Sequence, residues 1–101
     1  MFVIHATFPI APEHRDEAID LARELAAASR DEEGILEYRV ATDIDDRNLL
    51  RFVEQYEDEA AYEAHADTDH FGQFKASFSE LLAGKPEVTR FEVDAANDVE
   101  L

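Results

Sequence analysis

Strand-like and helix-like patterns follow one another along this chain in an order that few folds can accommodate. Four segments have the residue types and alternation of strands: 2–9, 35–42, 49–57 and 87–95. Three segments space their apolar side chains as one face of a helix does: 12–30, 58–66 and 69–83. This order predicts an α+β domain with the ferredoxin-like β-α-β-β-α-β arrangement.

Turn and capping residues separate these segments. Pro12 suits the first turn of a helix, and Gly84 and Pro86 are suited to ending one. The Asp and Asn residues of 43–48 predict the turn of a hairpin between the second and third strands. The chain has 101 residues and neither a linker nor a repeat, so we expect residues 1–101 to form a single domain.

Apolar side chains occupy both faces of the predicted sheet. Phe2 and Val3 point to opposite faces of the first strand, and Phe52 and Val53 do the same in the third. The helices can cover only one face, so the other requires a second sheet. A homodimer with packed sheets, a dimeric α/β barrel, supplies that cover. A monomer with one partly wet face is the alternative.

The charge of the chain restricts its partners. Asp and Glu total 25 and Lys and Arg total 9, giving a formal net charge of −16. Such a surface repels phosphate backbones and anionic lipid, so neither nucleic acid nor a membrane is an expected partner. An acid-rich chain whose only lysines are Lys75 and Lys85 resembles halophilic proteins, whose self-repulsion is screened at high salt. An acidic docking surface for a basic partner is the alternative.

Several classes of site have no support in the sequence. The chain has no cysteine, which excludes disulfides, thiolate catalysis and zinc–cysteine sites. It has no glycine-rich phosphate loop or nucleophile elbow, so no nucleotide or flavin cofactor is expected. No apolar run approaches the roughly 20 residues of a membrane span, and no basic leader precedes the first strand. We therefore expect a cytoplasmic protein.

Two histidines, His65 and His70, lie five residues apart around a break at Asp67 and Thr68, either of which suits the N-cap of the following helix. Histidine is suited to proton transfer near neutral pH, and the end of a helix dipole favours the protonated form of His65. Alternatively, both rings cap helices or satisfy hydrogen bonds in the core. A metal site is not expected from this spacing, although Glu54 could complete a triad with the two histidines.

Glu54 shares a strand face with Phe52 and Tyr56, which predicts a partly buried carboxyl group. Burial raises the pKa of a carboxyl group and suits it to act as an acid or a base. The alternatives are a buried ion pair with one of three arginines, Arg39, Arg51 or Arg90, and a hydrogen bond that orients a histidine.

Three segments resemble the antibiotic biosynthesis monooxygenase (ABM) family: 33–38, 52–61 and 64–71. The last of them has the form A-H-x-x-T-x-H-F. The resemblance implies a dimeric α+β barrel that encloses a small organic molecule. The haem-degrading members use an Asn, a Trp and a His where this chain has Ala6, His65 and Lys75, and the chain has no Trp. The resemblance is therefore closer to the quinol-monooxygenase-like members.

This resemblance implies a monooxygenase that acts without a cofactor on a small phenolic or quinol-type substrate. The candidate catalytic residues are His65, His70 and Glu54, around a cavity between the sheet and the helices. The candidate substrate-binding residues are aromatic side chains that otherwise read as plain core: Tyr38, Phe52, Tyr56, Phe71 and Phe74. The alternatives are an isomerase of a small carbonyl compound and a dimer that binds a small molecule without turnover.

Overall fold

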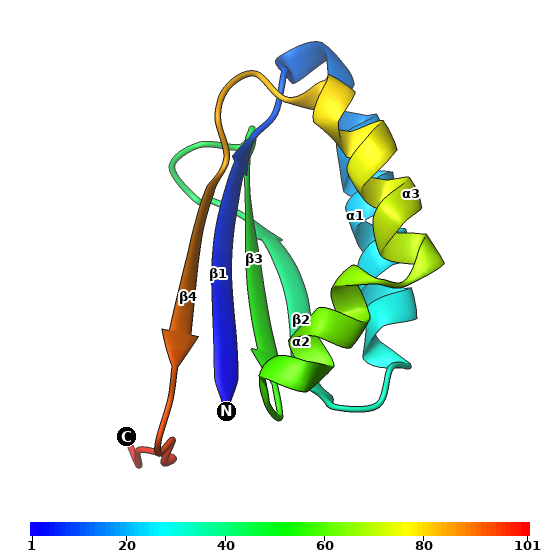
Figure 1. Cartoon of the computed structure of the whole chain (residues 1–101). Coiled ribbons are helices and arrows are strands. Elements are labelled where there is room, and N and C mark those ends of the chain that lie inside the picture. The colour runs from blue at the N-terminus through cyan, green and yellow to red at the C-terminus, as the bar shows by residue number, and fades with distance from the viewer.

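A four-stranded antiparallel sheet lies against three α-helices in the computed structural model, which describes all 101 residues (Figure 1). The strands are β1 (Phe2–Pro9), β2 (Ile35–Thr42), β3 (Leu49–Tyr56) and β4 (Glu87–Glu92). The α-helices are α1 (Arg15–Arg30), α2 (Glu59–Ala66) and α3 (Asp69–Phe78). The strand order is β2-β3-β1-β4, so the predicted ferredoxin-like α+β fold is confirmed.

The elements differ from the predicted ones mainly at their ends. The first helix starts as a 3₁₀ turn, η1 (Pro12–His14), and α3 is followed by another, η2 (Ser79–Leu81), instead of continuing to residue 83. Backbone bonds from Ala11 to Leu81 and from Ala83 to Pro9 hold this segment against the end of β1. These bonds pull the chain out of the helix before Gly84.

The last strand also ends earlier than predicted, at Glu92 instead of residue 95. Strand β4 pairs only with β1, and Phe2 is opposite Glu92. The backbone N–H of Val93 still donates to Met1, but no residue of β1 lies beyond it. The strand ends because its partner strand begins there.

One face of the sheet and the apolar faces of the helices form the core. The sheet contributes buried residues from alternate positions of its strands: Phe2, Ile4, Ala6, Tyr38, Leu50, Phe52 and Tyr56. Helix α1 contributes a stripe of mostly small residues: Ala18, Ala22, Leu25, Ala26 and Ser29. Short side chains on this stripe allow α1 to lie close to the sheet.

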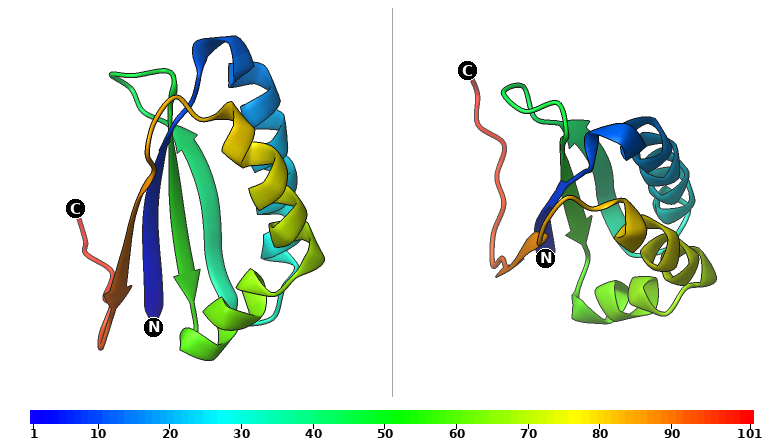
Figure 2. Two further views of the ribbon diagram at one scale, coloured as in Figure 1. Left: turned by 45° about the horizontal axis from the view of Figure 1, so that its top comes forward. Right: turned by 90° about the horizontal axis from the view of Figure 1, so that it is seen from above.

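The other face of the sheet carries no helix (Figure 2). Val3 and Val53 are half-buried on this face, and Phe91 of β4 is 43% exposed beside His5. The apolar side chains predicted for both faces are therefore present on both. No helix of the chain combines the length and the apolar composition needed to cross a membrane.

Candidate active site

Two segments far apart in the sequence, the loop after α1 and the break between α2 and α3, bring one carboxylate and two histidines together. The Nδ1 of His65 lies 2.9 Å from Oε2 of Glu32, and the Nε2 of His70 lies 2.7 Å from the same oxygen. An ionised carboxylate only accepts hydrogen bonds, so each of these nitrogens donates one. Glu32 follows α1 in the acidic loop, and no sequence pattern distinguishes it there.

The break between α2 and α3 fixes the positions of the two histidines. Thr68 is the N-cap of α3, where its Oγ1 accepts a bond of 3.2 Å from the backbone N–H of Phe71. The same hydroxyl donates to the carbonyl of His65 at 2.7 Å. Of the two residues suggested as caps, Thr68 caps α3 and Asp67 closes α2. Thr68 therefore joins the end of one helix to the start of the next.

His65 is 1% exposed, and its Nε2 has no hydrogen-bond partner. Its ring centroid lies 5.0 Å from that of Phe71, 5.3 Å from that of Tyr38 and 5.7 Å from that of Tyr56. Because Nδ1 carries the proton shared with Glu32, Nε2 is a bare acceptor surrounded by aromatic rings. An unpaired acceptor in a core is unfavourable unless something else pairs with it.

Burial lowers the pKa of His65, and this effect outweighs the opposing influence of Glu32. The expectation that the helix dipole favours protonated His65 is therefore wrong. The dipole at a helix end typically contributes only about 0.3–1 kcal/mol, whereas this ring lies in the core, where desolvation of the imidazolium is the larger effect.

Glu54 is also buried, at 6% exposure, and lies opposite Tyr38 of β2 in the sheet register. Its Oε1 accepts a bond of 2.6 Å from the hydroxyl of Tyr56. Desolvation raises the pKa of Glu54 to about 7, against the bonds from Tyr56 and Tyr38, which lower it. This confirms the raised pKa predicted from the strand pattern.

The ion pair suggested as the alternative partner of Glu54 does not form. Arg51 pairs with Asp43, and Arg90 lies near Glu59 and Glu92. Burial raises the pKa of both Tyr38 and Tyr56, and the nearby charge of Glu54 adds to this effect. Both phenols therefore stay protonated, and their hydroxyls act as hydrogen-bond donors to Glu54.

The predicted aromatic residues lie in or against the core. Tyr38, Tyr56 and Phe71 surround His65. Phe52 and Phe74 lie behind them, with ring centroids 6.0 Å apart. These side chains fill much of the space between sheet and helices where we expected a cavity.

A cleft of about 320 Å³ lies between α1 and α3. His70, with a side chain 33% exposed, and Phe74 line it together with residues of α1 such as Leu25. His70 is therefore the member of the histidine pair that a small molecule in this cleft meets first.

The same cluster has the donor set of a metal site. One ligand atom each from Glu32, His65 and His70 lies within 4.8 Å of the others. Two imidazoles and a carboxylate form the facial triad of many non-haem iron sites. Glu54, the possible third ligand suggested by the sequence, is not part of this cluster, and Glu32 lies beside the histidines instead.

Comparison with known proteins gives concordant matches. The model of the family described as "Antibiotic biosynthesis monooxygenase" matches residues 1–77. The Bacillus subtilis protein named "Putative monooxygenase YcnE" is 36% identical over 93 residues, which cover 92% of this chain and 98% of that protein.

Two solved structures extend this similarity to the fold. One, from Pseudomonas aeruginosa, is 33% identical with a TM-score of 0.85 and covers 93% of this chain and 94% of that one. Another, described as an antibiotic biosynthesis monooxygenase, is 27% identical with a TM-score of 0.88 and covers 94% of this chain and 100% of that one.

Proposed function

The chain belongs to the antibiotic biosynthesis monooxygenase family, and on that basis we propose that it oxidises a small phenolic or quinol-type substrate with dioxygen and without a cofactor. The observation that carries this proposal is the unpaired, buried Nε2 of His65. Two of the rings around His65, Tyr38 and Tyr56, carry hydroxyl groups, and that of Tyr56 donates to the carboxyl of Glu54. A phenolic hydroxyl is a donor that fits such an acceptor.

The first step is proton transfer from the phenol to Nε2 of His65. Ordinary pKa values of about 10 for a phenol and about 6.5 for an imidazole make this transfer unfavourable by roughly 5 kcal/mol. Burial of His65 increases that figure, whereas the charge of Glu32 and the attraction between imidazolium and phenolate reduce it. A turnover of about 10 s⁻¹ corresponds to a barrier of about 16 kcal/mol, so this step is compatible with ordinary enzymatic rates.

The phenolate then reduces dioxygen directly. One oxygen atom forms a bond to the ring carbon that loses its hydrogen, and the O–O bond breaks. The other oxygen leaves as water with the phenolic proton and the ring proton. The substrate loses four electrons to become a quinone, and dioxygen takes up all four.

Glu54 and the aromatic residues complete this mechanism. With a pKa of about 7, Glu54 exchanges protons readily at neutral pH and can return one to the departing oxygen. Tyr38 or Tyr56 orients the substrate oxygen by turning its hydroxyl from Glu54 to the substrate. Phe52, Phe71 and Phe74 enclose the ring, and a substrate passes His70 as it enters from the α1–α3 cleft.

The working form in this proposal is a cytoplasmic homodimer adapted to high salt. The apolar face opposite the helices, with Val3, Val53 and Phe91, is the surface that a second sheet would cover. The net charge of −16 opposes association at low salt, and counter-ions relieve that repulsion.

Oxygen uptake with a panel of hydroquinones and phenols tests the proposal, with assays run at high salt. We expect one dioxygen consumed per quinone formed, and strongly reduced uptake in His65→Leu and His70→Gln. His14→Gln is the matched control, because His14 lies before α1, away from the cluster. His65→Leu keeps the core apolar, and its circular dichroism spectrum checks that it folds.

Two results would contradict the proposal. Proton–deuterium exchange into a small carbonyl compound without oxygen use would identify an isomerase. A ligand-induced rise in melting temperature, with neither oxygen uptake nor exchange, would identify a protein that binds without turnover.

A further inference from the structure

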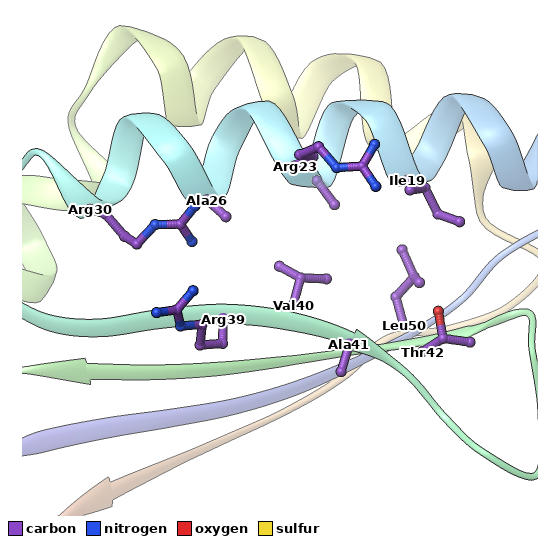
Figure 3. Close-up of a pocket in the computed structure, with 10 residues that line it drawn as sticks. Ile19, Arg23, Ala26, Arg30, Arg39, Val40, Ala41, Thr42 and Leu50 are labelled. Carbon is purple, nitrogen blue, oxygen red and sulfur yellow. The ribbon is translucent and has the colours of Figure 1, made fainter.

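A second cleft lies on the other side of α1, between that helix and the edge strand β2 (Figure 3). It has a volume of about 380 Å³, which falls within the range of roughly 300–1,000 Å³ typical of small-molecule sites. We call it the arginine cleft, because three arginines and several apolar side chains line it: Arg23, Arg30, Arg39, Ala26, Val40 and Leu50.

The charge of this cleft is opposite to that of the chain. Acidic residues outnumber basic ones by 25 to 9, yet all the charged residues that line the cleft are arginines. An open surface of this composition would place carboxylates near most cations. The absence of acids from the lining concentrates positive potential in one hollow, where low-dielectric walls focus it.

Arg30 and Arg39 come from opposite walls and turn their guanidinium groups toward each other (Figure 3). Neither forms an ion pair, and Arg30 donates one bond of 2.9 Å to the carbonyl of Tyr38. Arg23 is partly committed, at 3.5 Å from Asp20. Two facing guanidinium groups repel each other, and an anion between them converts that repulsion into attraction.

We infer that the arginine cleft binds an amphipathic organic anion, with its carboxylate or phosphate between Arg30 and Arg39 and its apolar body against Ala26, Val40 and Leu50. Guanidinium groups match both anions through paired N–H donors. The apolar wall between the arginines and Leu50, which is buried, favours an organic body over an inorganic ion.

This inference goes beyond the proposed oxidation and concerns binding alone. Its test uses no turnover, so its failure leaves the oxygen-uptake result unaffected, and the reverse also holds. A carboxylate of a second copy of the chain is the other source of negative charge, and the measurement of mass below distinguishes it.

Titration of the purified protein with four probes, followed by NMR, tests the two halves of the site separately. Hexanoate and hexyl phosphate carry both an anion and an apolar chain, hexanol lacks the charge, and inorganic phosphate lacks the chain. We expect saturable binding of at least one of the first two, with shifts of the methyl signals of Ile19, Val40 and Leu50. Hexanol and phosphate should bind at least tenfold more weakly. Equal binding of hexanol, or no saturable binding, would overturn the inference.

Arginine variants locate the anion. We expect Arg39→Gln and Arg30→Gln each to weaken binding about ten- to a hundredfold, the usual effect of losing a hydrogen bond to a charged group. Arg47→Gln is the matched control, because it removes the same charge from the turn between β2 and β3 and should leave affinity unchanged. An equal loss of affinity in all three variants would show that only the net charge of the protein matters, and would overturn the inference. The inference would also be overturned if no probe binds and Arg39→Gln changes the mass measured by analytical ultracentrifugation. That result would indicate that a carboxylate of a second copy of the chain occupies the cleft.

Discussion

Glu32 and His65 are 33 residues apart in the chain, and a part-buried hydrogen bond of 2.9 Å joins the loop after α1 to the end of α2. This bond decides which nitrogen of His65 carries the proton, and it leaves Nε2 as the acceptor. A carboxylate that orients a histidine in this way also stabilises the imidazolium that forms when the ring takes a proton. The loop after α1 therefore contributes to the acid–base chemistry of the break between α2 and α3.

Glu32→Gln should weaken this arrangement while keeping an acceptor oxygen in place. Loss of the negative charge should lower the pKa of His65 further, because Glu32 is the group that raises it. We expect kcat/KM for oxygen uptake to fall about ten- to a hundredfold, as for loss of a charged hydrogen-bond partner. An NMR titration of the His65 ring measures the pKa. Glu33→Gln removes the same charge from the exposed neighbouring position and should change neither quantity. An unchanged pKa in Glu32→Gln would contradict this role.

Glu54→Gln should change how stability depends on pH. The carboxyl of Glu54 has an ordinary pKa of 4.5 and a folded-state pKa of about 7. Between these pH values the folded protein binds more protons than the unfolded chain, so its free energy of unfolding falls as the pH rises through this window. At about 1.4 kcal/mol per pKa unit, the loss amounts to about 3 kcal/mol.

The variant keeps the shape and the acceptor oxygen of Glu54 but lacks this titration. We expect the unfolding free energy of Glu54→Gln, relative to the parent, to increase by up to about 3 kcal/mol between pH 4.5 and 8. Urea denaturation at a series of pH values measures it, since urea leaves the ionic strength constant. Glu80→Gln is the control at an exposed position, and its unfolding free energy relative to the parent should not change with pH. If the difference in unfolding free energy between Glu54→Gln and the parent did not change with pH, folding would not raise the pKa of Glu54.

Gly34→Ala should be strongly destabilising. Gly34 has a φ of +85°, and a Cβ there would lie 2.7 Å from the Cβ of Ala61 in α2. Both the left-handed backbone and this overlap oppose a side chain, so we expect a loss of more than about 1 kcal/mol, measured by urea denaturation. Gly72→Ala is the matched control: a methyl group added there, in α3, would meet nothing within 4 Å, and should raise stability by about 0.5–1 kcal/mol. Equal effects at both positions would contradict this explanation.

Phe91→Ser should weaken the proposed dimer. Phe91 is 43% exposed on the face without helices, where it contacts His5. We expect sedimentation at high salt to give a dimer for the parent and a larger monomer fraction for Phe91→Ser, because the variant loses apolar area from the interface. Ile44→Ser is the control, since Ile44 is fully exposed in the turn between β2 and β3. A parent that sediments as a monomer at every salt concentration would contradict the proposed assembly.

Local patterns predict most of the fold because they report local causes. The period of the strands, the capping hydroxyl of Thr68 and the small-residue face of α1 each appear within a few neighbouring residues. The predicted ends of α3 and β4 are wrong, since they are set by contacts with the ends of β1, which lie about 70 to 90 residues away. Sequence periodicity holds no information on such contacts.

The properties of the site residues also divide into those that local sequence predicts and those that depend on distant contacts. The raised pKa of Glu54 is predictable from its place between Phe52 and Tyr56 on a single strand face. The role of Glu32 is not, because nothing in an acidic surface loop distinguishes the one carboxylate that turns inward. The expectation of a protonated His65 is wrong, because the position of this residue at the end of α2 is visible in the sequence and its depth in the core is not.

Ala22 and Ala26 of α1 belong to the hydrophobic core and also line the arginine cleft. A single methyl group at each position therefore sets both the spacing of helix and sheet and the width of the hollow. A branched residue at either one would have to move the whole helix outward, which would change the shape of the hollow and the packing of the interior together. In a chain of this size, selection for a different ligand at this place cannot be separated from selection on how the protein folds.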